Sequence, residues 1–380
     1  MTTTSPPGLG TGPEPAGPDP ASNGARPSGP GHDALPLRGW VLRNQLVSMR
    51  LDPRSIVVCT TVAVTTVAVA CWSISVGDFP VPLSEVVASL FGGGSDDADF
   101  IVRTLRLPRA LTGALVGMAF GISGAIFQSL ARNPLASPDI MGFNQGAAAG
   151  AVFVIVVLGG TSSEVALGAM VGGIGTALLV FLLAMRGGVV RPYRLVLVGI
   201  GIGYAAFALV DYLMTRAEIY DVQRAAVWLT GSLNGRSWDH VRTVGLALVA
   251  LTPLAVLMQR WLDRLELSDE AAAGLGVPVG AAKLGLVVVG VSLAALAVAA
   301  AGPIAFVAFV AGPIARRMVD TPSAALIPAG LTGAMVMVVA DLAARRVLAP
   351  TELPVGIATA VIGAPYLLWL LFRQGRTGAL

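Results

Sequence analysis

Apolar and polar positions alternate along this chain in long blocks rather than residue by residue. Apolar runs recur from residue 55 to residue 372, and short polar or Pro- and Gly-bearing connectors separate them. A helix of about twenty apolar residues is long enough to cross the hydrocarbon core of a bilayer. Membrane-spanning strands would instead alternate every second residue, and these runs do not. The pattern therefore predicts an all-α, polytopic membrane protein.

About ten such runs are present, and each predicts one transmembrane helix. They cover residues 55–76, 107–130, 142–160, 164–186, 195–216, 241–259, 283–301, 303–316, 323–343 and 354–372. The eighth run is short and contains Pro313, so we expect a broken or tilted helix there. In the second run, Gly113, Gly117, Gly121 and Gly124 recur on one helical face, which indicates close packing against a neighbouring helix.

The distribution of basic residues predicts the orientation of these crossings. An even number of crossings places both termini on one side, and that side receives more of the 25 Lys and Arg residues than the other. Since cytoplasmic loops carry the excess of basic residues, both termini are predicted to be cytoplasmic. The opposite side still holds more arginines than this rule favours, among them Arg106, Arg109 and Arg345, and these need a separate explanation.

Two segments outside the apolar runs have a character of their own. Residues 1–50 are rich in Pro and Gly and predict a disordered cytoplasmic tail, whereas residues 51–376 form the transmembrane domain. Residues 260–282 make the most soluble-looking inner connector. Ser268 is a good N-cap, and Asp269 and Glu270 suit the positive end of a helix. We expect one or two short helices on the membrane face there. They form either a docking element for a cytoplasmic partner or a plain surface loop.

Composition limits the chemistry that this chain can perform. Only 12% of its residues are charged, and it has two His and two Cys, too few for a Cys/His metal cluster. Cys59 and Cys71 lie in one predicted helix and about 18 Å apart, too far for a disulfide. No G-x-x-x-x-G-K-[ST] motif is present, so a P-loop is excluded. The sequence predicts no cofactor and no enzyme active site, and any ATPase that drives this protein must be another chain.

Two alternatives rest on acidic residues. Asp96, Asp97 and Asp99 resemble the Mg²⁺-phosphate cluster of a membrane transferase. Their predicted place on the outer side, beside residues 92–94, favours a solvated loop instead. Asp211 and Asp341 lie in or at the edge of predicted helices, where a carboxylate is a candidate proton relay of a secondary transporter.

The neighbours of these two carboxylates offer a simpler interpretation. Asp341 stands four residues before Arg345, a spacing that allows an ion pair on one helical face. Asp211 and Arg216 can pair in a similar way near the outer end of their helix.

Three segments carry a resemblance to a known family. They are RLPRALTGALVGMAFGISGAIFQSLARNPLASPDIMGFNQGAAAGA at residues 106–151, AAAGPIAFVAFVAGPIARR at residues 299–317 and TELPVGIATAVIGAPYLLWLL at residues 351–371. Together, and in this order, they resemble the FecCD family, the permeases of ABC importers for ferric siderophores, haem and cobalamin. The resemblance spans about residues 51–376, and RNPLASPDIMGF is most similar to the ferric-enterobactin type. One departure is Gly312-Pro313, where many relatives have Pro-His.

The resemblance implies the type II ABC importer permease fold, with about ten transmembrane helices. It also implies partners: a second permease subunit (a copy or a paralogue), two cytoplasmic ATPase subunits and an extracytoplasmic substrate-binding protein. The cargo would be a ferric siderophore, with haem or cobalamin as the alternatives. No nucleic acid is expected among the partners.

The resemblance also implies roles for individual residues. Arginines matching Arg106, Arg109 and Arg345 would meet acidic residues of the binding protein, although such arginines can also extend to lipid headgroups. The inner gate would involve Asn133, Pro134, Leu135 and, more loosely, Pro192 and Tyr193. The element that couples the permease to the ATPase would comprise Ser268, Asp269, Glu270, Ala271, Ala272, Ala273, Gly274 and Gly276.

Overall fold

The computed structural model describes Thr2 and residues 40–43, 48–77, 79–186, 189–190, 192–321 and 323–377. The chain divides into two units, Met1–Arg50 and Leu51–Leu380. Most of the predicted tail over residues 1–50 lies outside the described residues. The described part of that region holds two short paired strands, β1 (Trp40–Arg43) and β2 (Ser48–Leu51).

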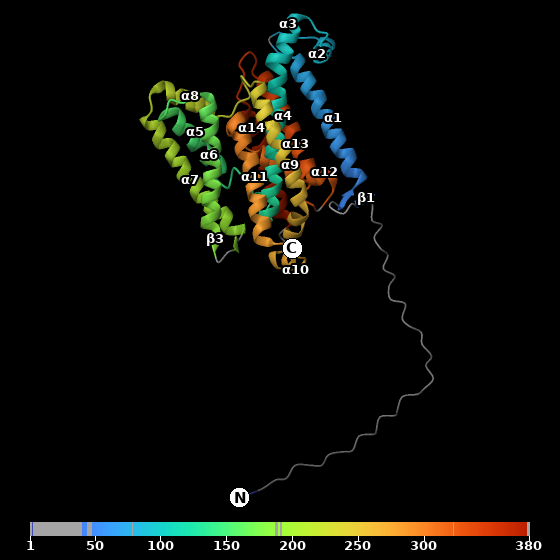
Figure 1. The fold of residues 1–380 in the computed structure, drawn as a ribbon, viewed down its shortest axis with the longest axis vertical. Helices are drawn as coiled ribbons and strands as arrows, with labels where there is room; N and C mark the ends of the chain where they lie inside the picture. The colour runs from blue at the N-terminus through green and yellow to red at the C-terminus, as the bar shows by residue number, and fades with distance from the viewer. Residues whose placement is uncertain are drawn as a thin grey trace, which may run out of the picture. The chain divides into compact units, whose positions relative to one another are not determined.

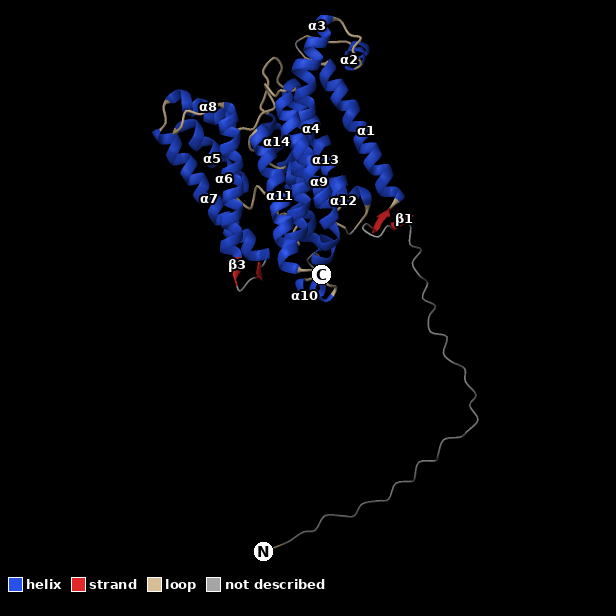
Figure 2. Ribbon diagram, in the orientation of Figure 1, coloured by secondary structure: helices blue, strands red, loops and turns tan. Residues whose placement is uncertain are grey.

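The second unit is a bundle of helices, and every predicted crossing coincides with one of them (Figures 1 and 2). These helices are α1 (Pro53–Ser75), α4 (Leu107–Ala131), α5 (Phe143–Val156), α6 (Ser162–Ala184), α7 (Pro192–Arg216), α9 (Trp238–Leu265), α11 (Val279–Ala301), α12 (Val307–Val319), α13 (Leu326–Arg346) and α14 (Val355–Thr377). In the described part of the chain, 7 helices are long and apolar enough to cross a membrane, and α5 and α14 are shorter apolar helices. The all-α, polytopic prediction is confirmed.

Several shorter elements were not predicted. They are α2 (Leu83–Leu90), α3 (Asp96–Asp99), the π-helix η1 (Phe100–Arg106), α8 (Ile219–Leu229), and the antiparallel strands β3 (Met185–Arg186) and β4 (Val189–Val190). The short helix expected within residues 260–282 is present as α10 (Asp269–Gly274). The prediction of a solvated loop at Asp96 and Asp97 is wrong in one respect. These residues are exposed, but they form the first turn of α3, where the Ser95 side chain accepts a hydrogen bond from the Ala98 N–H.

Helix α4 lies at the centre of the second unit and packs against α9, α11, α12 and α13. Its predicted glycine face explains how these helices approach so closely. A side chain at Gly117 would overlap the Gly333 carbonyl, and one at Gly124 would overlap the Ala308 carbonyl. Because lipid offers no hydrophobic attraction between helices, such backbone contacts supply much of their packing energy. Helices α5, α6, α7 and α8 form a second group, which α11 joins to the first through α5 and α6.

The two ends of this bundle carry different elements (Figure 1). One end, named the α8 end, holds α2, α3 and α8. The other end, named the α10 end, holds α10 and β3. The residues predicted to act as docking arginines and those predicted to act as a gate or coupling element therefore fall at opposite ends of the bundle.

Candidate functional site

Each end of the bundle holds a cavity. The cavity at the α10 end has a volume of about 440 Å³. It is lined by Gln128, Arg132, Asn133, Pro134, Glu266, Pro313, Arg316, Arg317 and Leu370. The cavity at the α8 end is larger, with a volume of about 570 Å³.

The gate residues Asn133, Pro134 and Leu135 form the turn that follows α4. Arg132 ends the helix with a φ of 50°, a left-handed conformation that reverses the chain. The Asn133 side-chain oxygen then accepts a hydrogen bond from the Leu135 N–H at 2.9 Å, which closes the turn. Asn133 and Pro134 face the α10-end cavity, and Leu135 packs on the cluster of Phe309, Val310 and Leu370.

The other two predicted gate residues lie elsewhere. Pro192 and Tyr193 begin α7, and Tyr193 is 75% exposed. Tyr193 lines neither of the two cavities. Asn133 and Tyr193 line no common cavity of the two described above, so a shared gate stays a prediction for the assembled transporter.

The predicted coupling segment contains a short, capped helix. The Ser268 hydroxyl accepts a hydrogen bond from the Ala271 N–H at 2.9 Å, which confirms the predicted N-cap of α10. Ala272 is buried and anchors this helix to the bundle. Its other predicted members are exposed or half-exposed: Ser268, Asp269, Glu270, Ala271, Ala273, Gly274 and Gly276. Leu267 and Leu275 flank the helix and are also exposed, so this end presents an apolar surface suited to a partner protein.

Asp269 connects this surface to the gate turn. One carboxylate oxygen of Asp269 accepts from Arg132 at 2.8 Å, and the other accepts from the ammonium group of Lys283 at 2.6 Å. Arg132 also donates to the Leu265 carbonyl at 2.8 Å. Through these contacts Asp269 links α10 to the end of α4, one residue before Asn133, and to the start of α11. Sequence reasoning missed this link because Arg132 and Asp269 are 137 positions apart.

All three predicted docking arginines have partners inside the chain. Arg106 donates to the backbone carbonyls of Ile74 and Phe79 at 2.6 and 2.7 Å. Arg109 forms ion pairs with Asp341 and with Glu352, both at 3.0 Å. Their guanidinium groups thus hold the α8 end together.

Arg345 pairs with Asp341 at 3.2 Å, which confirms the predicted helical ion pair. It also donates to the Ser73 carbonyl at 3.0 Å. The pairing expected for Asp211 is wrong, since no ion pair involves it in the described part of the chain. Arg216 instead lies over the Tyr212 ring, 5.8 Å from its centroid.

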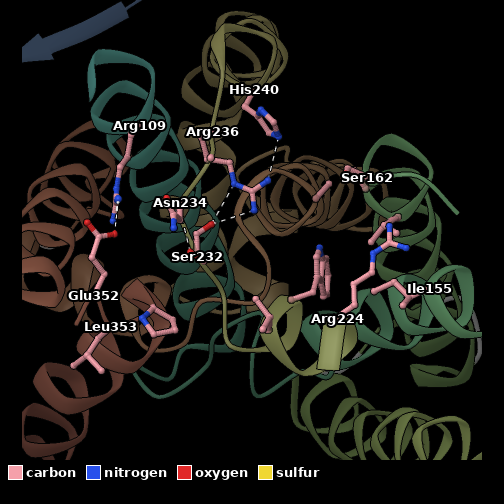
Figure 3. Close-up of a pocket in the computed structure, with 17 residues that line it drawn as sticks. Arg109, Ile155, Ser162, Arg224, Ser232, Asn234, Arg236, His240, Glu352 and Leu353 are labelled. Atoms are coloured by element: carbon pink, nitrogen blue, oxygen red, sulfur yellow. Dashed lines mark hydrogen bonds and ion pairs between the residues drawn. The ribbon is translucent and has the colours of Figure 1, made fainter. Parts of the chain in front are cut away.

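The α8-end cavity contains further basic residues that sequence reasoning did not single out (Figure 3). Arg224 of α8 donates to the Gly160 carbonyl at 2.6 Å. Arg236, in the loop before α9, donates to the Ser232 carbonyl at 3.2 Å and lies 3.1 Å from the His240 Nε2. Arg109 and its partner Glu352 form another wall of the same cavity. Nothing in the sequence grouped Arg224 and Arg236 with Arg109 and Glu352, because four separate segments contribute them.

A carboxylate inside the bundle was also missed. Asp139 follows the gate turn and accepts hydrogen bonds from the Phe306 N–H at 3.3 Å and from the Asn144 side-chain amide. Phe306 caps the start of α12 and Asn144 lies in the first turn of α5. Asp139 therefore ties together the starts of two short helices.

The comparisons with known proteins extend these observations. Residues 65–373 match the model of the FecCD transport family. The chain belongs to this family. Among its relatives, the ferric enterobactin transport system permease protein of Escherichia coli is 40% identical over 323 residues, which cover 85% of this chain and 98% of the relative. The achromobactin transport system permease protein of Dickeya dadantii is 40% identical over 310 residues, 81% of this chain and 88% of the relative.

A solved structure supports the same fold. A metal-chelate type ABC transporter in an inward-facing conformation matches with a TM-score of 0.75 and 25% identity, over 84% of this chain and 99% of that chain. This FecCD protein is thus a multi-pass membrane permease of the ABC importer type. The two bacterial relatives are transport permeases and not enzymes, so the transferase interpretation of Asp96 and Asp97 gains no support.

Proposed function

We propose that this chain is the permease subunit of an ABC importer that carries a ferric siderophore across the cytoplasmic membrane. The observation that carries this proposal is the 40% identity to a ferric enterobactin permease over 98% of that relative's length. Haem and cobalamin remain alternative cargoes. A separate pair of ATPase subunits supplies the energy, since this sequence contains no P-loop. A second permease subunit, either a copy or a paralogue, and a substrate-binding protein complete the transporter.

The proposal assigns a direction to the bundle. The α10 end faces the cytoplasm with both termini, and the α8 end faces outward. This assignment rests on the excess of basic residues on the side of the termini. The exposed apolar residues Leu267 and Leu275 around α10 then lie where a cytoplasmic ATPase can reach them.

Coupling follows from the contacts of Asp269. Nucleotide binding draws the ATPase subunits together and shifts α10, which they hold. Asp269 passes that shift to Arg132 and so to Asn133–Leu135 at the α10-end cavity. ATP can change the conformation only if the ATPase binds α10 differently in the two states, because a ligand shifts an equilibrium by its differential affinity.

Docking of the binding protein remains assigned to the α8 end, near Arg106, Arg109 and Arg345. These arginines form ion pairs with Asp341 and Glu352 and hydrogen bonds with backbone carbonyls. They therefore stabilise the structure of the docking surface and also give it positive charge. Charge reversal of Arg109 or Arg345 would therefore disturb folding and docking together, and exposed positions are better probes of docking alone.

Transport by reconstituted vesicles tests the proposal. The permease is assembled with its ATPase and binding protein in proteoliposomes, and uptake of radioactive ferric enterobactin, haem and cobalamin is compared. We expect ATP-dependent accumulation of the ferric siderophore in preference to the other two. Accumulation against a gradient by vesicles that lack the ATPase would refute the assignment to an ABC importer. Preferential uptake of haem or cobalamin would show that this compound, and not a ferric siderophore, is the cargo.

A further inference from the structure

The α8-end cavity collects three arginines from three parts of the fold (Figure 3). Arg109 comes from α4, Arg224 from α8 and Arg236 from the loop before α9. The cavity has a volume of about 570 Å³, within the range of roughly 300–1,000 Å³ that is usual for small-molecule sites. Apolar side chains, including the buried Ile155 and Val165, line part of its wall, and polar residues such as Ser162 and Asn234 line another part.

The positive charges in this cavity are not balanced. Arg109 is neutralised by Asp341 and Glu352. In the described residues, however, no carboxylate pairs with Arg224 or Arg236, whose acceptors are backbone carbonyls and one imidazole nitrogen. A guanidinium group carries five N–H donors, so Arg224 keeps several for a ligand. Burial also lowers the pKa of Arg236, because the surrounding wall desolvates its charged form. An anion in the cavity would offset that cost.

The surroundings hold Arg236 in position without neutralising it. A guanidinium group cannot accept a hydrogen bond, so the His240 Nε2 must accept from Arg236, at 3.1 Å. The other ring nitrogen, Nδ1, lies 3.1 Å from the Ser237 hydroxyl and 3.3 Å from the Ser237 backbone nitrogen. The imidazole is therefore neutral in this arrangement. Arg236 is pre-oriented by His240 and the Ser232 carbonyl, and a ligand would not have to order it.

Arg224 is exposed and Arg236 is half-buried, so a ligand that enters the cavity can reach both guanidinium groups. Iron chelates built from catecholates or hydroxycarboxylates present oxygen anions around the metal, together with apolar or aromatic parts. The guanidinium groups that lack a carboxylate partner can bind the oxygen anions, and the apolar residues of the wall, with Trp228, can contact the apolar or aromatic parts.

We propose that Arg224 and Arg236 form a cargo-binding site in the permease itself, which takes an anionic, oxygen-rich iron chelate. This inference rests on the proposed function. It names the charge class of the cargo and places its binding site in the cavity at the α8 end.

Equilibrium binding to the assembled permease–ATPase complex in nanodiscs, without the binding protein, tests this site. The probes are ferric enterobactin, an anionic tricatecholate, and a cationic ferric trihydroxamate as the charge-opposite control. We expect the wild type to bind the anionic chelate at least tenfold more tightly than the cationic one. R224Q and R236Q should each weaken binding of the anionic chelate at least tenfold, and added salt should weaken it further.

R242Q is the matched control, because Arg242 is exposed, lines neither cavity and, among the described residues, forms an ion pair with the exposed Asp239 alone. It should bind like the wild type. Co-purification of the ATPase subunits with R224Q and R236Q will show that these variants still assemble. Absence of chelate binding to the wild type, or equal binding by the wild type and the R224Q/R236Q double variant, would overturn the site.

Two further outcomes separate this inference from the function on which it rests. If the full transporter takes up ferric enterobactin but R224Q and R236Q weaken only the affinity for the binding protein, the cavity receives an acidic side chain of that protein, and the cargo site is refuted. If the full transporter takes up no ferric siderophore at all, the proposed function itself fails.

Discussion

Asp341 offers the sharpest test of what holds the α8 end together. Its carboxylate pairs with Arg109 and Arg345, and the three side chains are 7%, 14% and 10% exposed. Asp341→Asn keeps the shape of the side chain and removes its charge, so it leaves two nearly buried cations without their shared partner. Removing one member of a buried ion pair costs about 3–5 kcal/mol. Because Arg109 keeps Glu352, we expect the lower end of that range, about 3 kcal/mol.

The quantity to measure is the free energy of unfolding of the purified permease, obtained by denaturant titration in mixed micelles. Asp239→Asn is the matched control, since it makes the same chemical change at an exposed pair. Asp239 and Arg242 lie 3.8 Å apart and are 86% and 75% exposed. Exposed pairs contribute about 0–1 kcal/mol, so this control should change stability little.

The comparison between the two variants decides the question. If Asp341→Asn and Asp239→Asn lower the free energy of unfolding by the same small amount, the Asp341 network does not stabilise the bundle. Arg109 and Arg345 would then be available for docking without a structural cost, and their assignment as groups that hold the α8 end together would be wrong.

Three other substitutions test the coupling path and the helix packing. Asp269→Asn should lower ATP-driven uptake at least tenfold while ATPase activity persists. Adding Lys283→Met should restore the stability of the protein but not the coupling of ATP hydrolysis to uptake. Uptake and ATPase rates measured on the same vesicles check both expectations. Ala271→Arg, on the exposed face of α10, should weaken ATPase binding in a pull-down from detergent, and unchanged binding would remove α10 from the interface. Gly117→Val should abolish folding because the new side chain would overlap the Gly333 carbonyl. Gly175→Val is the control and should express normally, because Gly175 has open space beside it. Size-exclusion profiles of the two purified variants test this difference.

The crossings could be predicted from the sequence because each depends only on its own length and apolarity. The short α12 was expected from its apolar run, but it continues through Pro313 and is not broken there. The amphipathic α8 was missed because its 11 residues are too short and too polar to resemble a crossing. The cap at Ser268 and the Asp341–Arg345 pair were predicted, since each is a contact within one helical turn.

Contacts between distant segments account for what sequence reasoning could not find. Arg106, Arg109 and Arg345 were chosen through the family resemblance, which matches positions and carries no information on partners. Their engagement with Phe79, Glu352 and other groups becomes visible only in the folded chain. The same holds for Arg224 and Arg236, which were counted from the sequence only as part of an outer excess of basic charge.

Asp139 shows why a carboxylate belongs where this bundle interrupts its helices. The chain around residues 136–142 and 302–306 is not helical, yet it lies among packed helices, where unpaired backbone groups cost several kcal/mol. The Asp139 carboxylate accepts from the Phe306 N–H at the start of α12, where the helix dipole also favours negative charge. The Asp139 side chain therefore joins the start of α12 to the first turn of α5, just after the gate turn at Asn133–Leu135, and satisfies polar groups where the helices are interrupted.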